Sequence, residues 1–376
     1  MHLLASLAAH GWHSAAWRVS GAAGFDGAAP FRAMARTAER GGLDAVLLGM
    51  PTAPLALRAS GKVDGIRLDP LPLVGAMIGA TDRIGLCGWW PGDVAEPFHV
   101  ARVFATLDHL ASGRTGWITG LEGPQELGTR FRHTDLPASA EDSTARLVEL
   151  IDVARQLWDS WEDGGFVVDQ SSATFADPMR VHPIEHAGRF FTVRGPLNVP
   201  RPVQGQPVIL HRDVPSGTMR SGAAASAEVV LAEGATVVEA VASRRDWRTL
   251  AQKHGRDSEG LRFIVRVMPI LADSESGALK RAAELDGLAG VDAQQASGPH
   301  FVGTPDQFAD WLAHWHGAGA CDGFDILPAV LPVDLDMLVE AVVPQLRRRG
   351  LRRAGYEHPT LRGHLGLRRA PSRFAA

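Results

Sequence analysis

Two histidines and an arginine near the start of the chain could supply protons and positive charge to a reaction. His10, His13 and Arg18 follow the first apolar run, which spans residues 2–8. The ordinary pKa of histidine lies close to neutral pH, so either imidazole could donate a proton to a substrate. A histidine that only satisfies a local hydrogen bond is the more common case, and the sequence leaves both interpretations open.

A second set of residues could bind an anion. His211 and Arg212 end another apolar run, and Ser216 follows where a helix is predicted to begin. Backbone N–H groups at the start of a helix, together with a guanidinium group, are typical of phosphate sites. Arg212 could instead form an ion pair with Asp213 or Asp325, and this alternative also stays open.

Tryptophans accompany the same predicted strand ends. Their rings could stack on a flat or apolar ligand, or they could simply fill the core. They are Trp12, Trp17, Trp89 and Trp90. Cys87 lies within an apolar run, and we expect it to be an inert core residue.

Neither metal binding nor a disulfide framework is expected. His182 and His186 have the spacing of a zinc-binding pair on a helix, but Pro183 makes a helix that would hold both imidazoles on one face doubtful. The chain has two cysteines, which are too few for a disulfide framework and fit a reducing compartment.

Short apolar runs alternate with amphipathic helical stretches along the whole chain. We predict strands at residues 2–8, 43–49, 84–90, 115–120, 207–211, 228–232, 261–271 and 323–328. Eight strand-then-helix units in this length predict a (β/α)₈ TIM barrel of the α/β class. In such a barrel the ligand lies over the carboxyl ends of the strands, which is where the residues described above fall.

One long irregular segment interrupts this rhythm. Residues 164–206 lie between the fourth helix and the fifth strand, and they are expected to form a lid, a binding loop or an interface. We predict a single barrel domain over residues 1–350, with residues 351–376 as a tail. The arginines at 347–353 are expected to cap the last helix and to be solvated.

The composition argues against a role on nucleic acids or in membranes. The 376 residues carry a net charge of −4, so no surface for polyanions is implied. No apolar segment reaches the roughly 18 residues of a membrane-spanning helix. No signal peptide is recognisable, so we expect a cytoplasmic protein that binds a small molecule.

Several long motifs resemble those of one enzyme family. They include TAERGGLDAV (37–46), EPFHVARVFATLDHLASGRTGW (96–117) and FADPMRVHPIEH (175–186). On these motifs the sequence resembles the luciferase-like flavin-dependent monooxygenases, in the branch of the nitrilotriacetate, dibenzothiophene-sulfone and pristinamycin monooxygenases. The resemblance implies a barrel that takes reduced FMN from a separate flavin reductase and oxidises a small organic substrate with O₂. It also implies a homodimer or homotetramer.

The chain departs from this family at positions where the family contacts flavin. Gly49 stands near the place of a carboxylate, and Trp89 stands where the family has a Thr or Asn. Ile118 replaces an amide, while Ala140 and Thr144 fall where the family has a histidine and an Arg-Tyr pair. Each buried polar group left without a partner costs about 1–3 kcal/mol. The pattern therefore predicts a preserved scaffold with an altered cofactor site.

If flavin is bound, the resemblance implies a role for each candidate residue. Two tryptophans would border the ring, residues after the fifth strand would hold the phosphate, and the segment around His10 would supply a proton. The residues expected to bind the cofactor are Trp89, Trp117, His211, Arg212, Ser216 and Arg220, and those expected to act in catalysis are His10, His13 and Arg18.

Three hypotheses remain open at this point. The first is an active FMN-dependent monooxygenase that holds its cofactor in a modified way. The second is a degenerate homologue that no longer binds flavin, either a non-catalytic subunit that pairs with a catalytic homologue or a binding protein for another small molecule. The third is flavin-independent chemistry at His10, His13 or His211.

Overall fold

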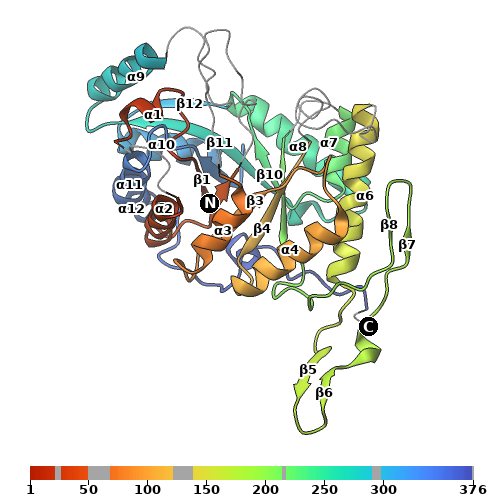
Figure 1. The fold of residues 1–376 in the computed structure, drawn as a ribbon. Helices are drawn as coiled ribbons and strands as arrows, with labels where there is room; N and C mark the ends of the chain where they lie inside the picture. The colour runs from red at the N-terminus through yellow and green to blue at the C-terminus, as the bar shows by residue number, and fades with distance from the viewer. Residues whose placement is uncertain (22–26, 50–67, 122–138, 214–216, 290–297, 375–376) are drawn as a thin grey trace, which may run out of the picture.

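The computed structural model describes residues 1–21, 27–49, 68–121, 139–213, 217–289 and 298–374. Eight parallel strands form a closed barrel, which confirms the predicted fold (Figure 1). Neighbouring strands follow chain order, and the ring closes where β1 pairs with β13. The strands are β1 (His2–Leu7), β2 (Ala45–Leu48), β3 (Gly85–Trp89), β4 (Thr115–Thr119), β9 (Val208–Arg212), β10 (Val229–Ala232), β11 (Arg262–Leu271) and β13 (Gly323–Ile326).

Helices surround this barrel on its outside and at its carboxyl end. They are α1 (Ala16–Val19), α2 (Ala29–Arg40), α3 (Pro70–Ile78), α4 (Pro97–Leu110), α6 (Ala140–Trp158), α7 (Gly217–Ala224), α8 (Val237–Lys253), α9 (Glu275–Ala289), α10 (Pro305–Gly317), α11 (Val333–Met337) and α12 (Val343–Arg348). Their ends follow local chemistry. Helix α4 begins at a proline and is followed by Ser112 and Gly113, both with positive φ, which turn the chain into β4. Thr236 and Thr304 close capping boxes at α8 and α10.

The core has two layers, because successive side chains along a strand point to opposite faces of the sheet. Leu47, Ile118 and Leu210 belong to the cluster inside the barrel. Trp117 belongs to the outer layer, where its ring stacks on Phe104 of α4. A shift of one residue along a strand therefore moves a side chain from the barrel interior to the helix layer.

The long insertion does not lie where a lid over the carboxyl ends of the strands would lie. It contains two hairpins, β5–β6 (Phe166–Asp169 and Thr174–Ala176) and β7–β8 (His186–Ala187 and Thr192–Val193). Its end is fixed at the amino end of the barrel, where the Gln204 side chain donates to the carbonyl of Thr115 at the start of β4. Figure 1 shows β5–β6 projecting away from the barrel, and β7–β8 lying beside α6.

The tail closes the amino end of the barrel. Leu361 of α13 (Leu361–His364) and Leu365 belong to the interior cluster. Arg362 makes two hydrogen bonds to Glu228, at 2.8 and 3.0 Å, and Arg352 binds the buried Asp44 at 2.6 Å. The prediction that the arginine run is solvated is therefore wrong for Arg352, because the barrel buries an acidic partner for it.

The short strand β12 (His300–Gly303) was not predicted. It pairs with the second half of β11, which is ten residues long and continues beyond the ring. Among the helices that the structure describes, none is long and apolar enough to cross a membrane.

Candidate functional site

Charged side chains meet inside the barrel on one side of its carboxyl end. The Ser6 hydroxyl donates to Asp325 at 2.8 Å, and Nε of Arg266 donates to the same oxygen at 3.2 Å. The Arg266 guanidinium also reaches Glu233 at 3.2 Å, and Arg212 approaches Glu233 at the same distance. We call Ser6, Arg212, Glu233, Arg266 and Asp325 the mouth network.

The mouth network is deeply buried at its centre. Asp325 is 0% exposed and Arg266 is 3% exposed. Burial raises the pKa of Asp325, although Arg266 and Ser6 act in the opposite direction. Oδ1 of Asp325 and Nη2 of Arg266 have no hydrogen-bond partner among the described residues. Two buried polar atoms therefore remain available to a ligand or to water.

Two tryptophans close the mouth above this network. The indole N–H of Trp12 donates to the Ser6 carbonyl at 2.7 Å, and the Arg266 guanidinium lies 5.2 Å from the Trp12 ring centre. Trp89 reaches across from β3, and its ring lies against Gly120 at the end of β4. Trp89 is 7% exposed, and its indole nitrogen has no partner among the described residues. One half of the mouth is thus charged and the other half is aromatic.

Gly49 allows Trp89 to take this position. Its φ is +78°, and a Cβ built there would lie 2.3 Å from Pro70 and 3.2 Å from Cβ of Trp89. Both the backbone and the space around it therefore require glycine. The neighbouring Met50 lies outside the described residues.

The predicted catalytic residues lie at one edge of the mouth, and each of them has different hydrogen-bond partners. Nδ1 of His10 lies 2.9 Å from the Ser20 hydroxyl, and the residue is partly exposed. His13 is 3% exposed, its Nδ1 accepts from the Ala15 N–H, and its Nε2 lies 3.2 Å from Asp286. Arg18 donates to the Leu288 carbonyl at 2.7 Å. His10 is therefore the more accessible imidazole of the two, because both nitrogens of His13 are engaged.

The two arginines expected to bind a phosphate are each held by a carboxylate. Arg212 pairs with Glu233, and Nη2 of Arg220 lies 3.0 Å from Asp213. Ser216 lies outside the described residues. The alternative in which Arg212 forms an ion pair is therefore the one the structure favours, although its partner is Glu233 and not Asp213 or Asp325.

Trp117 and His211 lie outside the candidate site. Both side chains face the helix layer, because the inward positions of their strands belong to Ile118 and Leu210. Burial lowers the pKa of His211 to about 3, and its Nε2 lies 3.0 Å from the Ser226 hydroxyl. Both faces of β4 are buried, so its sequence carries no polar–apolar alternation that would have revealed this parity.

Two charged residues of the mouth network were missed. Arg266 interrupts the apolar run of β11, and Glu233 directly follows the apolar run of β10. A cation in the middle of a buried strand is rare unless it is paired, so Arg266 carried a readable signal. Its partners depended on strand register and could not be read from the sequence.

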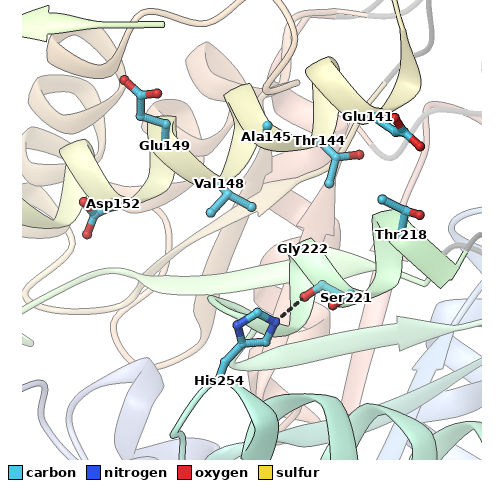
Figure 2. Close-up of a pocket in the computed structure, with 10 residues that line it drawn as sticks. All are labelled: Glu141, Thr144, Ala145, Val148, Glu149, Asp152, Thr218, Ser221, Gly222 and His254. Carbon is cyan, nitrogen blue, oxygen red and sulfur yellow. Dashed lines mark hydrogen bonds between the residues drawn. The ribbon is translucent and has the colours of Figure 1, made fainter. Parts of the chain in front are cut away.

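Outside the mouth, a pocket of about 560 Å³ lies between α6 and α7 (Figure 2). Its lining is partly acidic, with Glu141, Glu149 and Asp152 along α6, and His254 facing the Ser221 carbonyl at 2.9 Å. The Thr144 hydroxyl, near the place of a family polar contact, donates within α6 to Ala140. The candidate site remains the barrel mouth, because this pocket lies on the flank of the barrel.

The two histidines with zinc-like spacing take separate partners. His182 lies 2.7 Å from Glu162, and His186 lies 3.1 Å from Glu149. Within the described ranges no group of three or more His, Cys, Asp or Glu side chains could hold a metal ion.

Comparisons with known proteins place this chain in a family. Residues 8–301 match the luciferase-like monooxygenase family, and the chain belongs to it. It is 32% identical to N-acetyl-S-(2-succino)cysteine monooxygenase of Bacillus subtilis (98% of this chain, 97% of the relative) and 32% identical to nitrilotriacetate monooxygenase component A of Aminobacter aminovorans (97% and 96%). The structure of EDTA monooxygenase from Chelativorans sp. BNC1 superposes with a TM-score of 0.85, 25% identity and 98% coverage of both chains.

Two different subunits of one further enzyme, the pristinamycin IIA synthase of Streptomyces pristinaespiralis, are also similar to this chain. One of them is 32% identical over 95% of this chain and 94% of its own length. The other is 41% identical over 46% of this chain and 54% of its own length. An enzyme therefore exists in which two distinct subunits are both related to this chain.

The described residues of the mouth do not fit FMN well. A flavin ring needs open space over the strand ends, and there the buried Trp89 ring lies against Gly120. A phosphate needs cations that are not already neutralised, and Arg212 and Arg220 are each held by a carboxylate. The scaffold of the family is present, and the described part of the mouth is occupied by side chains of the chain itself.

Proposed function

We propose that this chain functions in an FMNH₂-dependent monooxygenase that oxidises a small organic substrate with O₂. The supporting observation is identity of 31–32% across at least 96% of the chain to several enzymes named as monooxygenases. In such a system a separate flavin reductase would deliver the reduced cofactor. The relative named component A supports a system of more than one component.

Within this proposal the barrel mouth receives a small molecule. Trp12 and Trp89 would contact its flat or apolar part, and the unpartnered atoms of Arg266 and Asp325 would contact a polar group. His10 would hold or release a proton at the rim. Because the described residues of the mouth do not fit FMN, we assign no step of the reaction to a flavin bound by this chain.

A second candidate function is favoured by the same mouth. In it the chain is a companion subunit that pairs with a catalytic homologue, or a binding protein for another small molecule. The filled aromatic half and the neutralised arginines support this candidate. The two related subunits of pristinamycin IIA synthase support pairing between homologues.

The experiment that tests the proposal measures oxygen transfer with and without a partner. The purified chain is supplied with FMNH₂ by a flavin reductase under ¹⁸O₂, and candidate substrates are screened for ¹⁸O incorporation by mass spectrometry. Product formed by the chain alone supports the catalytic candidate. Product formed only after co-expression with a homologous monooxygenase subunit supports the companion candidate. No product in either arrangement would count against an oxygenase role.

A further inference from the structure

A carboxylate at the end of β9 gathers three donors from the helices that follow it. Asp213 comes directly after β9 and lies 3.0 Å from Nη2 of Arg220 on α7. It accepts from the indole N–H of Trp247 at 3.0 Å and from the Ser243 hydroxyl at 3.3 Å, both on α8. A residue of the strand end is thus held by two separate helices.

The donor set is of a kind that suits an oxyanion. It combines a guanidinium, a hydroxyl and a ring N–H, and the Arg220 guanidinium also lies 5.9 Å from the Trp247 ring centre. The side chains of Arg220 and Asp213 are 19% and 12% exposed, so solvent screens their attraction only in part. An external phosphate group would find this donor set already occupied by a carboxylate.

The adjacent arginine is occupied in the same manner. Arg212 points into the mouth and approaches Glu233, which also receives Arg266. Each guanidinium described around the end of β9 therefore faces an acid from within the chain. Among the described residues, the arginines around the end of β9 are balanced by acids of the chain itself.

We propose that the Asp213 carboxylate occupies an oxyanion site that would otherwise be open to a ligand's phosphate. The wild-type protein therefore does not prefer ligands that carry a phosphate monoester. Loss of the Asp213 carboxylate creates this preference. The inference rests on the proposed function and concerns how the mouth recognises its ligand. It predicts that any flavin bound by the wild-type protein is held without help from its phosphate.

The test compares FMN with riboflavin, which differ by the phosphate alone. Binding is followed by flavin fluorescence in the wild-type protein, in Asp213→Asn and in Asp246→Asn, which makes the same charge change on an exposed face of α8. The amide introduced by Asp213→Asn keeps an acceptor oxygen for the Trp247 N–H, and its NH₂ group can donate to the Ser243 hydroxyl in place of accepting from it, but Arg220 loses this counter-ion. A second readout is the rise in melting temperature on adding inorganic phosphate at constant ionic strength.

We expect the wild-type protein and Asp246→Asn to bind FMN and riboflavin alike, or to bind neither. Asp213→Asn should prefer FMN by about tenfold, which corresponds to about 1.4 kcal/mol, or gain a phosphate-dependent rise in melting temperature. A folded Asp213→Asn protein that shows neither gain would overturn the proposal. Asp213→Ser, judged by the same two gains, replaces Asp213→Asn should the amide variant fail to fold, and Arg220→Gln adds a further test where the wild-type protein binds flavin.

Arg220→Gln in the wild-type background should leave FMN affinity unchanged, because Arg220 is already engaged by Asp213. A loss of about tenfold in FMN affinity, with riboflavin unaffected, would show that Arg220 binds the phosphate and would overturn the proposal. Failure of the proposed monooxygenase function would appear separately, as a lack of ¹⁸O transfer, and would leave the comparison of FMN with riboflavin intact.

Discussion

The Arg266 guanidinium reaches the Asp325 carboxylate between the adjacent strands β11 and β13, with 3.2 Å between Nε and Oδ2. Neither residue has appreciable contact with solvent, and a second acid, Glu233, shares the guanidinium. A buried pair of this kind is costly to break, since removal of one partner leaves the other charge without compensation. The mouth network thus couples the stability of the barrel to the site that would bind a ligand.

Replacement of Arg266 by Met should lower the free energy of unfolding by about 3–5 kcal/mol. The loss should be smaller at pH 5 than at pH 8. The folded-state pKa of Asp325 is already raised by burial and rises further without Arg266, so stability is kept at low pH and lost as the pH rises through that pKa. Urea unfolding at the two pH values measures both effects.

The control for this variant is Arg349→Met, which breaks pairs with the exposed Asp306 and Asp310 at 3.2 and 2.7 Å. Exposed pairs contribute about 0–1 kcal/mol, so this change should be nearly neutral. Equal losses in the two variants would contradict the assigned importance of the mouth network.

Replacement of Trp89 by Thr should open the aromatic half of the mouth. We expect flavin affinity to rise by about tenfold, because ring-sized space appears at the strand ends, and we expect stability to fall by about 3 kcal/mol through loss of buried area. Trp90→Thr is the matched control, because Trp90 packs near Phe104 on the outer side of β3. Unchanged flavin affinity in Trp89→Thr would show that Trp89 does not exclude the ring.

Replacement of Gly49 by Ala should destabilise the protein by more than about 2 kcal/mol. The Ala Cβ would overlap Pro70 at 2.3 Å, and its backbone would have to adopt a φ of +78°. Gly75→Ala supplies the comparison, since this helical glycine has open space around its Cβ position and alanine favours helix by about 1 kcal/mol. Thermal unfolding of the two variants should shift in opposite directions.

Replacement of His10 by Gln should lower turnover by about a hundredfold if the chain is itself the catalyst, because a proton donor at the rim is removed. His13→Gln should instead act mainly on stability, since both nitrogens of His13 are engaged and Asp286 is exposed. Turnover measured from pH 5 to 9 separates the two roles, because only loss of a proton donor changes the shape of the pH profile. Identical profiles for His10→Gln and the wild-type protein would remove His10 from catalysis.

The barrel could be predicted from the sequence because each strand is a short apolar run followed by a helix with a recognisable start. The direction of individual side chains could not be predicted as easily. Trp117 and His211 are each next in sequence to a residue that points into the barrel, so their own side chains point outward. The face of the strand on which a side chain lies decides whether it can meet a ligand or packs against a helix. The family resemblance drew attention to these residue types but not to the face of the strand on which they lie.

Topology alone could have located the insertion. A segment between a helix and the next parallel strand joins them at the amino end of that strand, opposite the active face of a barrel. The partners of Arg352 and Arg266 could not have been foreseen in this way, because Asp44 and Asp325 lie far away in sequence and meet them only through strand order.

The tail gives the last prediction, which concerns Arg352. Arg352→Met should lower the free energy of unfolding by about 1.5–3 kcal/mol at pH 7, because Asp44 is 0% exposed and would lose its 2.6 Å partner while Arg353 stays at 2.8 Å. Burial alone would raise the pKa of Asp44, but Arg352, His2 and Arg353 together hold it below its ordinary value. This pairing therefore stabilises the fold above the ordinary pKa of aspartate, and the stabilisation is lost as the pH falls through the lower folded-state pKa.

The difference in unfolding free energy between Arg352→Met and the wild-type protein should accordingly shrink as the pH falls below about 4. Arg348→Met, at the end of α12, provides a control that removes a cation from the same basic segment. A variant difference that stays constant from pH 7 to pH 3 would show that Arg352 stabilises the tail through packing of its aliphatic stem and not through its charge. Such a result would separate closure of the barrel by Leu361 and Leu365 from the ion pair that accompanies it.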